Sequence, residues 1–315
     1  MNYINELLTL SEINHEKDLK RGLKEHLKPE YLFKAYHNEL DEAYAEVRPN
    51  NQAFLEDELA DILWCWFMTT KRLEKLELIS NQETIFKKAL KKFQERVLPL
   101  NCNLEHDKKI WQEVKTKQKR ALEIEQFRYN VRDFYKPFYD KGDLAHKIDH
   151  ANSVCDLALK LNSGKYKEEL VILAAYLHDI FNAKDRKNHH KLAFEYVLNK
   201  KDKFLQNLST NDLNLVAHAI LEHRGSFKGN FYSKLSEIIS SADRGEPNLE
   251  KIIIRSLQFN KGNAKEVLAH IKNKYSYNGY GRYPKLYEEY FQKEIKIFKD
   301  KVENLTIKDI ENLNH

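Results

Sequence analysis

Two pairs of acidic residues stand at helical spacing near the beginning of the sequence. Glu39 and Glu42 are three residues apart, as are Glu58 and Asp61, so each pair projects from one face of a helix. The turn signal at residues 48–51, which contains a proline, predicts that these two helices pair antiparallel and that the four acids converge. Four carboxylates in one groove raise one another's pKa, and Mg²⁺ or Mn²⁺ relieves this repulsion. The pattern predicts a metal site that could hold a polyphosphate and position a water molecule.

The alternative is a solvated acidic face, which is common on surface helices. The second acidic pair argues against it, because Glu58 and Asp61 stand among apolar residues, where unpaired carboxylates would be costly. These apolar neighbours are Leu59, Ile62, Leu63 and Trp64.

Histidines gather in the second half of the sequence, where seven of the 13 fall between His146 and His223. His178 and Asp179 follow the apolar run 171–177, which must be buried, and a buried polar pair needs a partner. His150 and Asp243 are further candidates for the same site. Imidazole together with carboxylate suits a transition metal, whereas satisfied helix histidines are the alternative and the favoured interpretation for His146 or His190 taken alone.

The composition predicts an all-α protein of two domains that positions these residues. Gly (9) and Pro (6) are scarce in 315 residues, whereas hydrophobic (42%), charged (32%) and aromatic (11%) residues are those of a folded chain. The stretch 129–142, with Pro137, is the expected boundary, so we expect helical domains over residues 1–125 and 126–315. Before it, helices are expected at about 31–47, 54–76, 81–97 and 108–128. After it, they are expected at about 143–161, 167–181, 189–198, 211–223, 235–242, 248–256, 264–275 and 285–303.

Charge and cysteine content limit the classes of function. The net charge is +5, with 53 basic and 48 acidic residues, so a dedicated nucleic-acid-binding protein is not expected. The sequence has no run of about 18 apolar residues and begins without a signal-peptide pattern, so no membrane segment or export is expected. Cys65, Cys102 and Cys155 are widely separated, which favours a reduced, cytoplasmic protein.

The acidic motifs resemble those of MazG-type nucleotide pyrophosphohydrolases. The segment Asn38-Glu39-Leu-Asp-Glu42 followed by Glu58-Leu-Ala-Asp61 is similar to the EExxE…ExxD signature, although Asn38 replaces its first Glu, which leaves the number of metals open. The segments 27–29, 92–96 and 111–115 resemble later motifs of the same family. This resemblance implies Mg²⁺ at Glu39, Glu42, Glu58 and Asp61, and an all-α dimer or tetramer. It also implies phosphate contacts from Lys92, Arg96 and Lys115.

The histidine motifs resemble those of HD-domain phosphohydrolases, whose pattern is H…HD…D. The segments around His150, His178-Asp179 and Ser241-Ala242-Asp243 are similar to the three parts of that pattern. The resemblance implies a divalent transition metal such as Mn²⁺, Co²⁺, Ni²⁺, Fe²⁺ or Zn²⁺ on His150, His178, Asp179 and Asp243. His223 lies where some members place an added histidine, for a second metal or a phosphate. Candidate substrate-binding residues nearby are His146, Lys184, His223, Arg224 and Arg244.

Together these patterns predict a bifunctional, metal-dependent nucleotide hydrolase. The first domain would convert an NTP or dNTP to a monophosphate and pyrophosphate, with Glu39, Glu42, Glu58 and Asp61 as catalytic residues. The second would hydrolyse a phosphate ester, with His178 and Asp179 as catalytic residues, and would act on the monophosphate if the sites work in sequence. Hydrolysis of (p)ppGpp is an alternative, although the acidic pair usual after the HD motif in such enzymes is missing at residues 180–185. A regulatory protein that binds nucleotide without turnover is a third interpretation.

Overall fold

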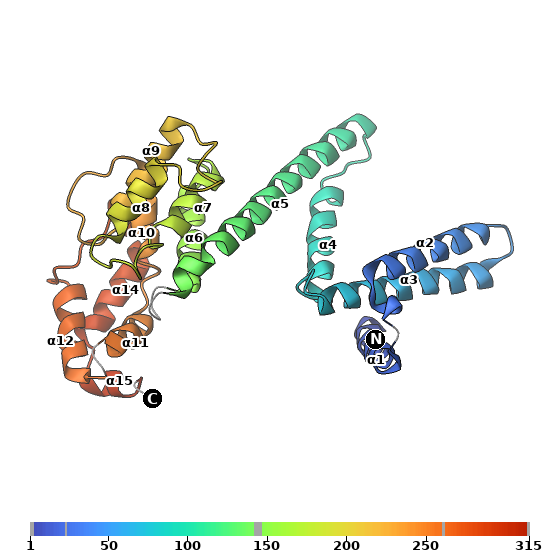
Figure 1. The fold of residues 1–315 in the computed structure, drawn as a ribbon, viewed down its shortest axis with the longest axis horizontal. Helices are drawn as coiled ribbons and strands as arrows, with labels where there is room; N and C mark the ends of the chain where they lie inside the picture. Colours follow the sequence, from blue (N-terminus) through green and yellow to red (C-terminus); the bar gives the residue numbers. More distant parts are fainter. Residues whose placement is uncertain (1–2, 23, 142–146, 260–261, 314–315) are drawn as a thin grey trace. The chain divides into compact units, whose positions relative to one another are not determined.

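The protein is built from helices that form two compact units. A computed structural model describes residues 3–22, 24–141, 147–259 and 262–313. These described residues contain helices and no strand, which confirms the predicted all-α class. Residues 1–119 form the first unit and residues 120–315 the second (Figure 1). The assignment of separate functions to residues 1–125 and 126–315 stays a prediction.

The first unit is organised around one helix pair. The helices α2 and α3 pack against each other as the predicted antiparallel pair, with α1 on another side of α3 and α4 near the end of α3 (Figure 1). Pro29 occupies the first turn of α2, where its missing N–H has no partner to lose. The elements are α1 (Tyr3–Arg21), the short 3₁₀ helix η1 (Glu25–Leu27), α2 (Pro29–Ala45), α3 (Gln52–Lys75), α4 (Gln82–Val97) and the first part of α5 (Leu104–Asp140).

A buried ion pair fastens α1 to α3. The side chain of Arg72 on α3 is 1% exposed, and its Nη2 lies 2.7 Å from Oδ2 of Asp18 on α1. The same guanidinium contacts Nδ1 of His15, while its Nε is buried with no hydrogen-bond partner in the described part of the chain. Because a buried guanidinium is costly without an anion, this pair fixes where α1 can lie on α3.

Removing the anion of this pair should destabilise the first unit strongly. We expect Asp18→Asn to lower the free energy of unfolding by about 3–5 kcal/mol, because Arg72 would keep a buried, unpaired charge. Urea unfolding followed by tryptophan fluorescence measures this unit selectively, since Trp64, Trp66 and Trp111 all precede residue 120. Arg21→Ala is the matched control: this guanidinium also faces Asp18, but it is 60% exposed, so a loss below about 1 kcal/mol is expected. Equal losses in the two variants would contradict the prediction.

The second unit packs around α7, which is buried over most of its length. Its residues 170–177 are all buried, and the helices α5, α6, α9 and α10 contribute to the same core. A smaller hydrophobic cluster joins α11, α12, α14 and α15. The helices after α5 are α6 (Ile148–Asn162), α7 (Glu168–Leu177), α8 (His189–Leu198), α9 (Thr210–Leu221), α10 (Lys234–Asp243), α11 (Leu249–Phe259), α12 (Ala264–Tyr275), α13 (Lys285–Tyr290), α14 (Gln292–Glu303) and α15 (Ile307–Glu311).

The helix α5 differs from the sequence-based expectation. It was expected to end near residue 128, but it continues through Pro137 to Asp140. The physical reason is the packing of its last turns: Val131, Tyr135 and Tyr139 recur every four residues and are at most 1% exposed. Their burial in the core outweighs the single backbone hydrogen bond that a proline removes.

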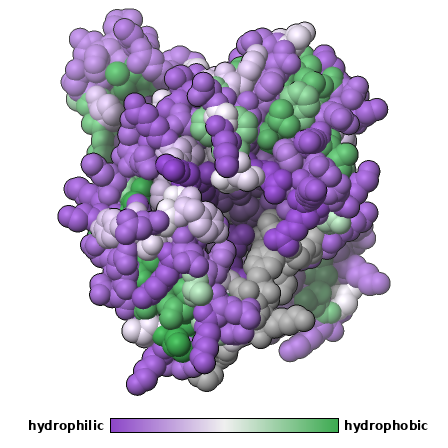
Figure 2. Space-filling model, turned by 90° about the vertical axis from the view of Figure 1, so that its left-hand side faces the viewer, coloured by the Kyte–Doolittle hydropathy of each residue, from purple (hydrophilic) through white to green (hydrophobic). Residues whose placement is uncertain are grey.

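On the side of the molecule that carries α12, the described residues form no large hydrophobic area. Figure 2 shows a mostly hydrophilic face on which hydrophobic residues form small separate areas. Among the described residues, no helix is both long enough and apolar enough to cross a membrane.

Candidate functional site

Three of the four predicted acids converge between α2 and α3. Glu39 of α2 meets Glu58 and Asp61 of α3, and one carboxylate oxygen from each lies within 4.8 Å of the others. Glu42 lies outside this set, but its negative charge acts on both Glu39 and Glu58. The helix pairing therefore concentrates negative charge as the spacing of the acids predicted.

The electrostatics of this acidic cluster suit a cation. Burial raises the pKa of Glu39, and the charges of Glu42 and Asp61 raise it further. The pKa of Glu58 is raised by burial and then by Glu42, Asp61 and Glu39. Oε2 of Glu58 is buried and accepts no hydrogen bond from the described part of the chain. A hard divalent cation such as Mg²⁺ would supply both the missing ligand partner and the missing positive charge.

The surroundings of the acids are less buried than the sequence predicted. Leu59 and Leu63, which were expected to form an apolar setting, are 52% and 49% exposed. They point to the surface because α2 and α1 cover only part of α3. Within one chain, these apolar residues of α3 are therefore partly exposed to solvent.

The predicted phosphate-binding residues lie on other elements. Nε of Arg96 on α4 donates to Oε1 of Gln118 at 2.9 Å, and its guanidinium lies over the ring of Trp111 at 5.3 Å. Nζ of Lys92 lies 5.6 Å from the centre of the ring of Phe93. No contact in the described part of the chain joins Lys92, Arg96 or Lys115 to the acids. A single chain does not bring these two groups together.

Protons and Mg²⁺ should compete for the acidic cluster. Because the folded-state pKa of Glu39 and of Glu58 is raised above the ordinary 4.5, their protonated forms favour folding. The stabilisation from protonated Glu39 and Glu58 is complete when the pH is below their ordinary pKa. It is lost as the pH rises through their folded-state pKa. Mg²⁺ replaces the lost contribution, so its stabilising effect should grow as the pH rises above 4.5. At a Mg²⁺ concentration of 100 Kd the effect is about 2.7 kcal/mol.

Thermal unfolding followed by tryptophan fluorescence, with Mg²⁺ or with a chelator, tests this prediction. Glu58→Gln should remove most of the Mg²⁺ effect and raise the Tm of the metal-free protein at neutral pH. Glu56→Gln is the matched control, because Glu56 is exposed on α3 and, among the described residues, accepts a side-chain hydrogen bond only from Gln52. A Mg²⁺ effect that is independent of pH and survives in Glu58→Gln would refute the assignment.

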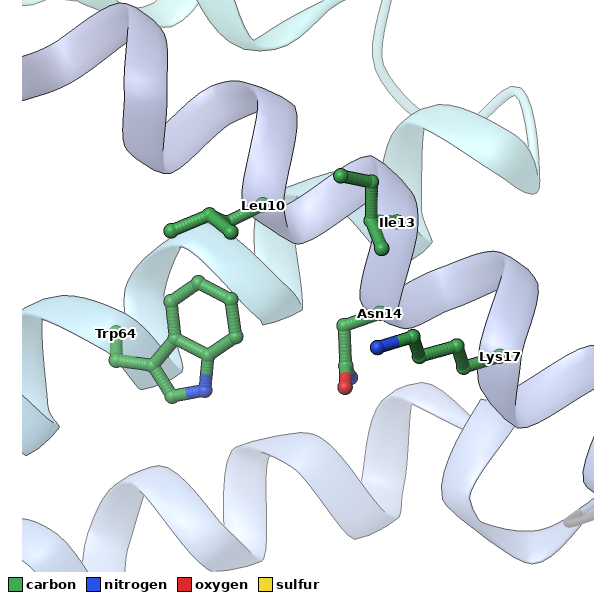
Figure 3. A pocket seen from close by; sticks show the side chains of 5 residues that line it. All are labelled: Leu10, Ile13, Asn14, Lys17 and Trp64. Atoms are coloured by element: carbon green, nitrogen blue, oxygen red, sulfur yellow. The ribbon is translucent and has the colours of Figure 1, made fainter.

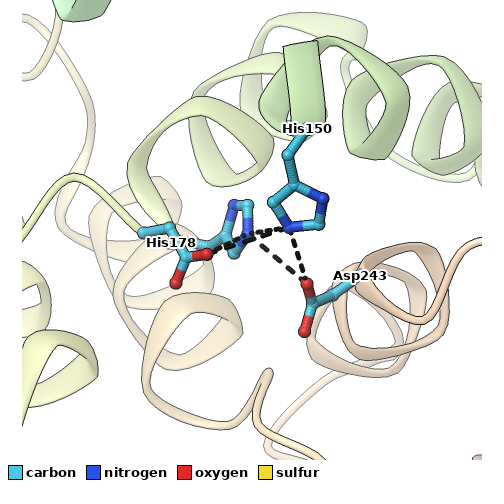
Figure 4. Close-up of side chains that lie close together, drawn as sticks. His150, His178 and Asp243 are labelled. Carbon is cyan, nitrogen blue, oxygen red and sulfur yellow. Dashed lines mark hydrogen bonds and ion pairs between the residues drawn. The ribbon is translucent and has the colours of Figure 1, made fainter. Parts of the chain in front are cut away.

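The second unit brings the predicted HD residues into one cluster. His150 comes from α6, His178 and Asp179 directly follow the buried α7, and Asp243 is the last residue of α10. Nε2 of His150 lies 3.1 Å from Oδ1 of Asp243 and 3.4 Å from Nε2 of His178 (Figure 4). Oδ2 of Asp179 lies 3.3 Å from Nε2 of His178. One ligand atom from each of the four residues lies within 4.8 Å of the others.

Asp179 connects this set to a second one. Its other oxygen, Oδ1, lies 3.1 Å from Nε2 of His189 and 3.7 Å from Nε2 of His223. The two sets of ligand atoms thus lie on the two oxygens of one carboxylate, an arrangement suited to a pair of ions with Asp179 between them. His223 was predicted as a possible ligand, whereas His189 was not. The sequence feature that could have indicated His189 is a His-His pair at the start of a helix, ten residues after the HD motif.

Backbone hydrogen bonds set the tautomers of these histidines. Nδ1 of His178 lies 2.7 Å from the carbonyl oxygen of Ala175, and Nδ1 of His223 lies 2.6 Å from that of Ile220. Nδ1 of His189 bonds in the same way to the carbonyl oxygen of the residue three positions earlier. Because a carbonyl only accepts, each Nδ1 carries a proton, so each Nε2 faces inward and can bind either a second proton or a metal ion.

The inward-facing Nε2 atoms of these histidines favour a positive charge between them. Nε2 of His189 and Nε2 of His223 lie only 3.3 Å apart, and two lone pairs at that distance repel unless a proton or a metal ion lies between them. Burial by itself would raise the pKa of Asp179, but His178 and the hydrogen bonds from the histidines hold it well below its ordinary value. Imidazole and carboxylate donors with oriented partners fit transition-metal ions, so the residues present suit the predicted cofactor.

Basic residues near this cluster use some of their N–H donors in hydrogen bonds within the chain. Nη1 of Arg224 donates to the carbonyl oxygen of Lys187 at 2.9 Å, and Nη1 of Arg244 donates to Oγ of Ser240 at 2.9 Å. Both guanidinium groups keep further N–H donors, which suit phosphate oxygens. Nζ of Lys184 lies 5.8 Å from the centre of the ring of Phe181. His146, the remaining predicted substrate-binding residue, lies outside the described residues.

The comparisons with known proteins agree with these two sites. Residues 27–98 match the MazG nucleotide pyrophosphohydrolase domain, and residues 146–256 match the HD domain. The chain therefore joins an N-terminal MazG domain to a C-terminal HD domain, and members of both families are typically hydrolases. The MazG match contains the four acids, Lys92 and Arg96 but ends before Lys115. Neither the curated proteins nor the solved structures give a match to the chain.

Proposed function

We propose that the protein is a bifunctional nucleotide hydrolase with one metal-dependent site in each unit. The observation that carries the proposal is the gathering of candidate metal ligands in both units. Glu39 and Asp61 lie beside Glu58 with its buried Oε2, and four histidines lie around the two oxygens of Asp179. The matches to the MazG and HD domains supply the class of reaction.

In the first unit, Glu39, Glu42, Glu58 and Asp61 would hold Mg²⁺ and convert an NTP or dNTP to its monophosphate and pyrophosphate. When bound, Mg²⁺ would offset the charge of the phosphates and position the attacking water. Carboxylates not engaged by the ion can accept the proton of that water. Lys92, Arg96 and Lys115 would stabilise the negative charge on the departing pyrophosphate.

A second copy of the chain would complete this site. The basic residues are separate from the acids within one chain, and the apolar neighbours of the acids, Leu59 and Leu63, remain half exposed. A dimer or tetramer formed through the first unit would cover these residues and could bring Lys92 and Arg96 of one copy to the acids of another. Sedimentation of the whole protein and of Leu63→Glu would test this arrangement.

In the second unit, His150, His178, Asp179 and Asp243 would hold a first transition-metal ion, and Asp179, His189 and His223 a second. The metal would supply a water of lowered pKa and a positive charge for a phosphate oxygen. Arg224, Arg244 and Lys184 would bind the remaining phosphate oxygens and orient the ester. The substrate would be a nucleotide phosphate ester, and the monophosphate made by the first unit is the natural candidate.

A panel of nucleotides with separated products tests the whole proposal. Protein supplied with Mg²⁺ and Mn²⁺ would be incubated with NTPs, dNTPs, the monophosphates and ppGpp, and the products would be resolved by chromatography. Release of pyrophosphate from triphosphates and of inorganic phosphate from monophosphates is expected. Release of neither product from any of these nucleotides would refute the proposal.

A further inference from the structure

A pocket in the first unit has no role in the functions described so far. It has a volume of about 330 Å³ and lies between α1 and α3. Leu10, Ile13, Asn14 and Lys17 of α1 line it together with Trp64 of α3 (Figure 3). The α1 residues precede the segment that matches the MazG domain, whereas Trp64 lies inside it.

The lining combines an aromatic face with a few polar groups. Figure 3 shows Leu10 beside the indole of Trp64, whose nitrogen is on the side of Asn14 and Lys17. Nδ2 of Asn14 donates to Oδ2 of Asp18 at 3.2 Å and contacts Sδ of Met68 at 3.6 Å. Asp18 in turn is held by the buried Arg72. These contacts fix the orientation of the amide, so that its oxygen is left as an acceptor for a ligand.

One residue that lines the pocket lies close to the acids along α3. Trp64 follows Asp61 by three residues on α3, which is a rise of about 4.5 Å along the helix axis. A volume of about 330 Å³ is at the lower end of small-molecule sites, and it suits a base better than a whole nucleoside triphosphate. Lys17 is the cationic group of the lining, and it lies between Asn14, which contacts Met68, and Asp18, which pairs with Arg72, at the end of the pocket away from Asp61.

We infer that this pocket holds the base of the nucleotide whose phosphates are bound at Glu39, Glu58 and Asp61. Trp64 stacks on the base, and Oδ1 of Asn14 accepts a hydrogen bond from an exocyclic amino group. The favoured substrates therefore carry adenine, cytosine or guanine rather than uracil or thymine. This inference rests on the proposed function of the first unit.

Binding of non-hydrolysable nucleotides tests the inference without requiring turnover. The probes are the α,β-imido analogues of dATP, dCTP, dUTP and dTTP with Mg²⁺, measured by calorimetry on the full chain. Trp64→Ala should raise the Kd of the dCTP analogue by about 10-fold or more, as expected for loss of base stacking. Trp64→Phe, which keeps a ring, should change it by less than about three-fold. Asn14→Leu should remove the preference for dCTP over dUTP.

Two comparisons separate this inference from its alternatives. Tripolyphosphate has no base, so an equal loss of its affinity in Trp64→Ala would show that the variant damages the acidic cluster and would overturn the inference. Trp66→Phe is the matched control, because Trp66 packs on Phe67 and Phe86. Unchanged nucleotide affinity in Trp64→Ala, or a wild-type preference for uracil or thymine, would also overturn it.

The outcome is distinguishable from failure of the proposed function. A protein that releases no pyrophosphate but binds the analogues in a Trp64-dependent manner would refute the reaction and keep the base site. If Trp64→Ala instead dissociates an oligomer and leaves nucleotide affinity unchanged, a second copy fills the pocket and the inference is wrong.

Discussion

Asp179→Asn should abolish release of inorganic phosphate by the second unit, with a loss of at least about 10³-fold in kcat/KM. Asp179 is 5% exposed, and its two oxygens face both sets of histidines, so one substitution weakens the binding of both proposed ions. Asparagine keeps the size of the side chain but removes its negative charge and replaces one acceptor oxygen by an N–H donor. The histidine lone pairs would then lack the shared anion that makes a cation site favourable.

Metal content provides a second measurement for this prediction. The wild-type second unit should carry two transition-metal ions per chain, whereas Asp179→Asn should carry fewer than one. His189→Asn should lose one ion and keep the ion at His150, His178 and Asp243. Asp156→Asn is a matched control, because Asp156 is 56% exposed and its ion pair within the described part of the chain is with Arg128. Full metal content and activity in Asp179→Asn would place the reaction elsewhere.

Glu58→Gln should abolish pyrophosphate release by the first unit, by about 10²–10³-fold, and leave phosphate release from monophosphates intact. Glu58 contributes the buried Oε2, for which the described residues offer no hydrogen-bond partner, so the amide would remove the negative charge of a ligand that is left available for the ion. Because Asp179→Asn should give the opposite result, the two variants separate the two activities. Glu56→Gln should retain both.

Each variant should lose one activity and keep the other, and this result would distinguish two independent sites from one shared site. If Glu58→Gln also eliminates phosphate release from a monophosphate, the two reactions do not occur at separate centres. If it leaves pyrophosphate release unchanged, the acidic cluster is a solvated surface feature, which is the alternative that the sequence left open.

The fold class and the residue types of both sites could be predicted because they depend on local sequence. Helical spacing places Glu58 and Asp61 on one face of α3 wherever α3 lies, and the apolar run before His178 requires burial in any all-α fold. The end of α5 could not be predicted locally. Its last turns are stabilised by Val131, Tyr135 and Tyr139 in a core formed by residues distant in sequence.

Sequence alone determined which chemical groups are present: acids three residues apart, an HD pair after a buried run, and the fold class that must carry them. The tertiary structure decided which groups meet. It left Lys92 and Arg96 apart from the acids within one chain, and it added His189 to Asp179. It also formed the pocket of Trp64 from a helix outside the MazG motifs. The physical reason is that backbone geometry sets the spacing along a helix, whereas distances between helices depend on the burial of side chains from the whole unit.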